Sequence, residues 1–287
     1  MMMMQRIKTK FIHMISKIVF WFAIILIALY ILFPIYWALI SSLKTGNQLM
    51  MTPTTFIPRD PVTYKFKPTL ENYQVVFESK AYRIGLVNSI IVAGSTTLLS
   101  LIIGSLGAFA LGKLHFRGKR PTIYLILSMT MFPQIAVLTG LYTIFNTFKI
   151  PAIPSMVLSY LLFTLPFTTW MLTNYFKGFP DEIMQAAWID GATPFQTFRM
   201  ILLPLSVPAV ISTGLLAFIY AWNEYLFALV FSAIEPEART VTVAVAYFGS
   251  TFTSQSVAAA IVTTIPALIL IMIFQSRLSA GIANLTS

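Results

Sequence analysis

The stretch GFPDEIMQAAWIDGATPFQTFRMILLPLSVP, residues 178–208, separates two long runs that contain no charged residue. The run before it lies between Lys149 and Lys177, and the run after it lies between Arg199 and Glu224. Each run has room for the roughly 20 apolar residues that a helix needs to cross a bilayer. The stretch is therefore a polar connection between two predicted transmembrane helices.

Four further uncharged intervals lie outward from this stretch, bounded by Lys17 and Lys44, Arg83 and Lys113, Arg120 and Lys149, and Arg239 and Arg277. A hydrophobic content of 57%, a charged content of 10% and a mean hydropathy of +0.82 exclude an ordinary water-soluble domain. We predict an all-α membrane protein with one transmembrane domain over residues 18–276. Its six helices are expected at residues 18–40, 85–111, 121–143, 154–176, 207–231 and 256–276.

Basic residues beside these runs indicate the orientation in the membrane. Four of them fall in the tight turn at residues 112–120, and others fall in the amino-terminal tail at residues 1–17 and in the loop at residues 177–206. Short loops rich in Lys and Arg stay in the cytoplasm. We expect both termini, including the tail at residues 277–287, to be cytoplasmic. The longer loop at residues 41–83 is also basic, so the prediction depends on the tight loops.

Composition excludes several other classes. The net charge of +10 is concentrated beside membrane-length runs, where it meets anionic lipid, so no nucleic-acid partner is expected. The apolar run at residues 18–40 exceeds the roughly 7 to 15 residues of a cleaved signal sequence, and it is expected to remain as the first helix. The chain has no cysteine, which excludes thiolate metal sites and disulfides. His13 and His115 are isolated, so no metal site is predicted.

The polar stretch reads as two short capped helices. Pro180 followed by Asp181 suits a helix start, because acidic side chains favour the positive end of the helix dipole. Gly191 suits a helix end. Thr193 as N-cap, with Gln196 three residues later, predicts a capping box at the start of the second helix.

One face of the first short helix carries small and mostly apolar side chains. Ile183, Ala186, Ala187 and Asp190 share this face at helical spacing. Such a surface is suited to lying closely in a groove on another protein. The alternative is an amphipathic connector that rests on the membrane surface.

Three stretches resemble one family of transport proteins. The loop carries Gln185-Ala186-Ala187, then Asp190-Gly191-Ala192, and later Leu203-Pro204, in the order of the EAA motif of permease subunits of binding-protein-dependent ABC importers. The sequence LGAFALGKLHFRG at residues 106–118 and the sequence WNEYLF at residues 222–227 resemble further signatures of the maltose-type carbohydrate permeases. The resemblance, closest to the G-subunit type, implies the type I importer permease fold.

This resemblance implies partners and a role for the loop. The loop helix would be the coupling helix, which docks in a cytoplasmic ATPase through Ile183, Gln185, Ala186, Ala187, Asp190, Gly191 and Ala192. The family has glutamate where Gln185 stands, so a contact that needs a carboxylate is lost there. Two copies of the ATPase would bind ATP and Mg, and this chain would hold no cofactor.

Outside the cytoplasm the resemblance implies an extracytoplasmic sugar-binding protein, contacted by the loop that carries Tyr247, Phe248 and Gly249. A second, homologous permease subunit would complete a heterodimer in a bacterial or archaeal plasma membrane. The implied cargo is a disaccharide or oligosaccharide of the maltose or trehalose kind.

Glu224 is the only acidic residue within a predicted span. A charge there is costly, by about 2.5 to 3.5 kcal/mol on insertion scales, so the side chain should face protein or water. With Trp222, Asn223 and Tyr225 it forms a group suited to sugar hydroxyls and a pyranose face. The alternative is a structural polar pair between helices.

Two competing functions remain. An ion-coupled secondary transporter would need several intramembrane acids or broken helices, and only Glu224 qualifies. A membrane-embedded enzyme would need a nucleophile with its base, or a metal cluster, and no such set is visible. The chain also lacks a phosphate-binding loop that would let it hydrolyse ATP. We therefore predict a non-catalytic subunit without catalytic residues.

Overall fold

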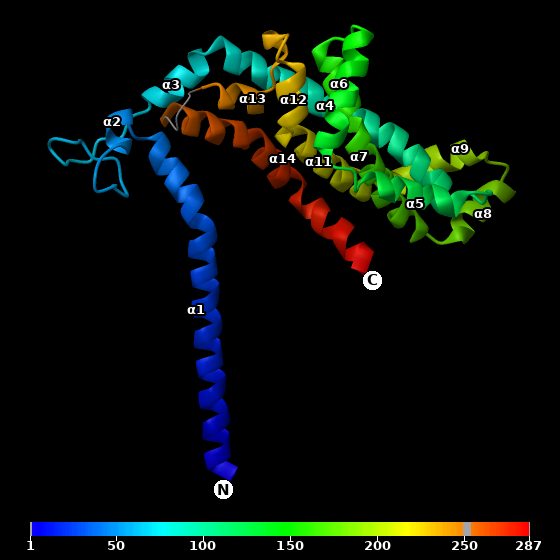
Figure 1. Ribbon diagram of the computed structural model, residues 1–287. Helices are drawn as coiled ribbons and strands as arrows, with labels where there is room; N and C mark the ends of the chain where they lie inside the picture. Colours follow the sequence, from blue (N-terminus) through cyan, green and yellow to red (C-terminus); the bar gives the residue numbers. More distant parts are fainter. Residues whose placement is uncertain (1, 249–253, 287) are drawn as a thin grey trace. The chain divides into compact units, whose positions relative to one another are not determined.

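A computed structural model describes residues 2–248 and 254–286, with side chains over residues 13–248 and 254–275. Figure 1 shows the helices of the chain, which divides into two compact units. One unit takes the chain up to Val76 and the beginning of α14 (Ser254–Thr286). The other takes the chain from Phe77 to Tyr247 and the rest of α14. Apart from a single β-bridge between Arg59 and Phe66, the described residues form helices and turns.

The first unit begins with α1 (Met2–Ser42), whose apolar part runs from His13 to Ser42. Large side chains along it are exposed; Trp21 is 61% exposed and Tyr30 is 80% exposed. A helix that is apolar all round is stable only in lipid or against a partner. Two short helices follow, α2 (Gly46–Leu49) and α3 (Glu71–Glu78).

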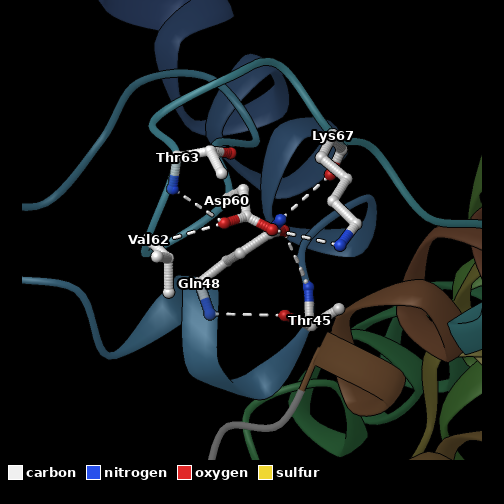
Figure 2. Close-up of polar contacts among 6 residues, drawn as sticks. All are labelled: Thr45, Gln48, Asp60, Val62, Thr63 and Lys67. Carbon is white, nitrogen blue, oxygen red and sulfur yellow. Dashed lines mark hydrogen bonds and ion pairs between the residues drawn. The ribbon is translucent and has the colours of Figure 1, made fainter.

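A turn organised by Asp60 lies between α2 and α3 (Figure 2). The Asp60 carboxylate accepts hydrogen bonds from the backbone N–H groups of Val62 and Thr63, both at 3.0 Å, and from Lys67 Nζ at 3.0 Å. These bonds, that of Thr63 first, lower the pKa of Asp60. The Gln48 amide donates to the Lys67 carbonyl at 2.9 Å, which fixes the turn to α2.

The second unit is built around α4 (Lys80–Lys113) and α7 (Ala152–Lys177), which form the most extensive helix contact. A Cβ atom at Gly104 would lie 2.8 Å from Thr168 Cγ2, and one at Gly112 would lie 3.2 Å from Phe176 Cβ. Ser100 and Thr168 are joined by a hydroxyl hydrogen bond of 2.7 Å. The missing side chains at Gly104 and Gly112 therefore let α4 and α7 pack closely.

The segment predicted as one helix at residues 121–143 is two helices. They are α5 (Lys119–Met129) and α6 (Gln134–Thr147), which meet at 94°. Pro133 stands at the N-cap of α6. Because proline has no N–H and disfavours a helical residue before it, α5 cannot continue through this position.

The segment predicted at residues 207–231 is also divided, into α11 (Val207–Asn223) and α12 (Leu226–Phe231). Glu224 between them has an extended backbone, with φ −66° and ψ 131°. Two short helices, η2 (Pro236–Ala238) and α13 (Val241–Ala246), follow before α14. The described residues contain four helices long and apolar enough to cross a membrane. There are up to six spans if two bent pairs, α5 with α6 and Pro194–Leu205 with α11, each count as one.

Candidate functional site: the loop between α7 and α11

The first helix of the loop forms as the caps predict. α8 (Asp181–Ile189) begins directly after Pro180 and carries Asp181 and Glu182 in its first turn. At its end Gly191 has a φ of +86°, a left-handed conformation that favours glycine. The Ala192 N–H donates to the Ala187 carbonyl at 2.9 Å, which closes the helix end.

The second helix also begins as predicted, with α9 (Pro194–Thr197). Thr193 Oγ1 accepts from the Gln196 N–H, and the Gln196 side chain accepts from the Thr193 N–H at 2.8 Å. The helix continues through η1 (Phe198–Leu202), a π-helical turn, and α10 (Leu203–Leu205). It then meets α11 at 80°. The helix runs through Pro204, and the bend follows after Leu205.

An apolar cluster attaches the loop to the long helices. Met184, Phe198 and Leu202 of the loop are 2%, 5% and 0% exposed. Their partners come from α4, α7 and α11: Ala108, Phe109, Leu172, Phe176 and Ala209. The ring centroids of Phe109 and Phe198 are 5.3 Å apart. Burial of these side chains attaches α8 and η1 to the bundle.

An ion pair adds a polar attachment at the start of α8. Lys113, the last residue of α4, places Nζ 2.5 Å from Asp181 Oδ1 and 2.5 Å from the Phe179 carbonyl. The hydrogen bond from Lys113 and its charge lower the pKa of Asp181, and His115 and Lys119 add smaller effects. The sequence predicted only that Asp181 favours the positive end of the helix dipole. It did not predict the ion pair with Lys113, because the two residues lie 68 positions apart.

The structure shows which face of α8 is free. Ala187 is 6% exposed and Ile183 is half-buried against the apolar cluster, so part of the predicted docking face packs on this chain itself. Gln185, Ala186 and Asp190 remain exposed, and Gly191 is exposed beside the half-buried Ala192. The exposed apolar side chains of α8 are instead Ile189, which is 85% exposed, and Trp188, which is 39% exposed.

The four residues at the break between α11 and α12 take different positions. Glu224 is 7% exposed, and its carboxylate accepts from the N–H groups of Phe227 at 3.0 Å and Ala228 at 3.2 Å. It thus caps α12. Trp222 is 2% exposed and donates from Nε1 to the Thr263 carbonyl at 3.2 Å. Asn223 and Tyr225 are exposed, so only these two present side chains outside the packed core.

A further polar contact near this break was not foreseen. Gln134, at the start of α6, donates a hydrogen bond to the Tyr220 hydroxyl on α11. The bend at Pro133 brings α6 to α11, which a straight helix at residues 121–143 would not predict. Gln134 and Tyr220 therefore join Asn223 and Tyr225 as candidates for a polar path.

The loop expected to meet a binding protein is partly described. Tyr247 is 58% exposed, and the guanidinium carbon of Arg239 lies 4.1 Å from its ring centroid. This geometry is that of a cation–π contact. Phe248 is half-buried, and Gly249 lies outside the described residues. Within residues 13–248 and 254–275, there is no group of three or more His, Asp or Glu side chains that could hold a metal ion.

The described residues combine membrane-length helices with a capped polar loop that packs against them. The family model for the "Binding-protein-dependent transport system inner membrane component" matches residues 87–284. The chain belongs to this family, and it is a permease subunit of an ABC importer. The predicted all-α importer permease fold and the predicted function as a permease of an ABC importer are confirmed, and the comparisons give the ion-coupled alternative no support.

Named relatives cover nearly the whole chain. The trehalose transport system permease protein SugB of Mycobacterium tuberculosis is 35% identical over 87% of this chain and 96% of its own length. The trehalose/maltose transport system permease protein MalG of Thermococcus litoralis is 33% identical over 94% and 96%. A sulfoquinovosyl glycerol permease, SmoH of Agrobacterium fabrum, is 34% identical over 88% and 87%.

Solved structures share the fold. A chain of a bacterial ABC transporter that imports the acidic polysaccharide alginate matches with a TM-score of 0.74 at 22% identity. The match covers 91% of this chain and 96% of that one. A methionine ABC transporter in an inward-facing conformation matches with a TM-score of 0.55 over 74% of this chain.

Proposed function

We propose that this chain conducts a disaccharide of the trehalose or maltose kind and couples its passage to a cytoplasmic ATPase through α8. The observation that carries the coupling role is the two-sided character of α8. Its inner face is anchored by Met184 and Ala187, while Ile189 and Ala186 stay exposed on the outside. A partner that binds the exposed apolar face of an anchored helix can displace this helix, and the packed inner face transmits the displacement to the bundle.

The chemistry of the exposed face suits a protein groove. Ala186 has a small side chain that allows close approach, and Ile189 and Trp188 supply apolar area that a partner would bury. Gln185 offers a neutral hydrogen bond where the family has glutamate. Glu182, exposed one turn before Gln185, is placed to supply the missing charge.

Membership of the family supports a proposal for the rest of the assembly. We propose two ATPase copies that bind ATP and Mg, a second homologous permease and an extracytoplasmic sugar-binding protein. The exposed apolar surface of α1 is consistent with lipid or a second permease as its neighbour. The setting proposed is a bacterial or archaeal plasma membrane, with both termini in the cytoplasm. For the pathway we propose Asn223 and Tyr225 as contacts, with Trp222 and Glu224 supporting them from behind.

The substrate proposal rests on relatives. Two relatives of at least 33% identity carry trehalose in their names, and the exposed pair of an amide and a phenol suits sugar hydroxyls. Uptake into proteoliposomes by the reconstituted importer should require ATP and should favour trehalose or maltose over glycerol phosphate. Uptake by this chain alone, driven by an ion gradient without ATP, would contradict the proposal.

Docking is tested with two exposed positions, one on α8 and one in the turn at Asp60. Ile189→Glu should abolish co-purification of the ATPase and leave the amount of permease in the membrane unchanged. Val62→Glu is the matched control, because Val62 is 86% exposed against 85% for Ile189 and lies in the turn at Asp60. Normal co-purification and uptake with Ile189→Glu would count against α8 as the docking element.

A further inference from the structure

α4 is an uninterrupted rod through the second unit. It has 34 residues, which at the usual rise corresponds to about 51 Å. Of the four long helices that qualify as spans in the described part of the chain, α4 is the one without proline; the others contain Pro34, Pro166 and Pro266. α4 thus runs as one continuous helix without proline, a common site of sharp helix kinks.

The end of α4 nearest the coupling loop is bonded to that loop directly. Lys113 is 5% exposed and bonds both Asp181, in the first turn of α8, and the carbonyl of Phe179. Lys119 donates to the carbonyls of Gly112 at 3.3 Å and Leu114 at 3.1 Å, which covers the helix end. A movement of α8 therefore acts on α4 through a buried ammonium group.

The opposite end of α4 is bonded to the segment at residues 235–247, which we call the outer loop. The Asn88 amide donates to two carbonyls, that of Glu237 at 2.7 Å and that of Arg239 at 2.9 Å. Ser89 Oγ accepts from the N–H of Val241 at 2.8 Å. At Gly85 an added Cβ would lie 3.1 Å from Ala244 Cβ, so α13 lies directly on the helix surface. Figure 1 shows α13 near one end of α4 and α8 at the other.

Arg239 extends this attachment to the exposed residue of the outer loop. Its carbonyl accepts from Asn88, and its guanidinium lies over the ring of Tyr247. The contacts thus run from Tyr247 through Arg239 and Asn88 along α4 to Lys113 and Asp181. Neither neighbour of α4 offers an equally direct route, because α7 contains Pro166 and the α11–α12 segment is broken at Glu224.

We infer that α4 is the rod through which occupancy of the outer loop by the binding protein reaches the coupling helix, with Asn88 and Lys113 as positioning residues at its ends. The inference rests on the proposed function, since it needs an ATPase on α8 and a binding protein at the loop. Neither residue touches substrate or ATP. Their role is to keep two distant surfaces moving as one body.

The test is the stimulation of ATP hydrolysis by the substrate-loaded binding protein in proteoliposomes that hold the whole importer. Asn88→Ala should leave the importer assembled and its basal hydrolysis intact, while stimulation falls about tenfold, within the usual range of coupling between sites. Asn72→Ala is the matched control. Asn72 and Asn88 are each 6% exposed, and each donates to two carbonyls. Those bonded by Asn72 belong to Ser42, at 2.7 Å, and Lys44, at 2.9 Å, and Asn72 lies outside α4.

A second pair of variants tests the end of α4 at Lys113. Lys113→Met should reduce stimulation as Asn88→Ala does, and Lys113→Arg should restore much of it. Lys44→Met is its control, because Lys44 is a buried lysine bonded to the carbonyl of Thr55. Should Asn88→Ala prevent assembly, Ser89→Ala removes only the bond from Val241 and serves in its place.

The outcomes separate the two proposals. Equal stimulation in Asn88→Ala, Lys113→Met and their controls would overturn the role of α4. Equal loss in the controls would also overturn it, since it would show a general loss of stability. Failure of the unaltered chain to bind any ATPase, or to respond to a binding protein, would instead remove the proposed function itself.

Discussion

Lys113 Nζ lies 2.5 Å from Asp181 Oδ1, yet the lysine side chain is 2% exposed and the aspartate side chain is 66% exposed. The pair is therefore asymmetric: water reaches the carboxylate but not the ammonium group. Within the side chains that the structure describes, the other two ion pairs, Lys67–Asp60 and Lys80–Glu237, have at least one strongly exposed partner and no buried lysine.

This asymmetry predicts unequal costs for the two single substitutions. Asp181→Ala leaves a buried ammonium group with only the Phe179 carbonyl, at a cost of about 1–3 kcal/mol in the free energy of unfolding. Lys113→Met should cost less, because the remaining carboxylate is solvated. Denaturant unfolding in detergent measures both. A larger loss for Lys113→Met would contradict the asymmetric picture.

A pH dependence follows from the same contact. Folding lowers the pKa of Asp181, so its stabilising contribution is present above the ordinary value of about 3.9 and is lost as the pH falls through the lowered folded value. The stability difference between the unaltered chain and Asp181→Asn should be constant near neutral pH and shrink in acid, below about pH 4. Unfolding midpoints measured at a series of pH values check this. A difference that persists unchanged in acid would assign the effect to packing.

The two neighbouring alanines of α8 should respond differently to the same change. Ala187→Glu places a charge against the apolar cluster, so we expect lower stability of the permease itself as well as loss of ATPase binding. Ala186→Glu adds charge on the exposed face and should block ATPase binding alone. Thermal unfolding and co-purification of both variants measure the two effects. Similar stability losses in the two variants would show that α8 is turned differently.

Glu224 should act mainly as a cap. Glu224→Ala removes the acceptor for the N–H groups of Phe227 and Ala228, for which we expect a loss of about 0.5–2 kcal/mol, and Glu224→Gln should lose less because one side-chain oxygen still accepts. Sugar uptake and thermal stability are measured together. Unaltered stability with changed uptake in Glu224→Gln would instead place the side chain in the path.

Contact between α4 and α7 should depend on Gly104. Gly104→Ala brings a Cβ to 2.8 Å from Thr168 Cγ2, and such overpacking costs about 1–3 kcal/mol. Adding Thr168→Ser removes that methyl group and keeps the hydroxyl bonded to Ser100, so the double variant should recover stability. Gly140→Ala, with no atom within 4 Å of the added Cβ, is the control. Failure of the second substitution to restore stability would mean that the clash is relieved elsewhere.

The amino-acid sequence by itself determined the local features of this protein. Uncharged runs long enough for a bilayer predict the spans, and Thr193, Gln196 and Gly191 predict the caps that the structure contains. These signals act between residues close in the chain, through the N–H groups at a helix start and the left-handed conformation at its end. They do not require knowledge of what lies across the fold.

Only the tertiary structure decided which groups face one another. Ile183 and Ala187 share an apolar face with the expected periodicity, but periodicity cannot say whether a partner or the same chain covers it. In the sequence Glu224 is an isolated acid within a predicted span. In the structure the helix breaks before α12, and the Glu224 carboxylate accepts from the N–H groups of Phe227 and Ala228. The contacts of Lys113 with Asp181 and of Asn88 with Arg239 span 68 and 151 positions, so chain closure and packing alone bring them together.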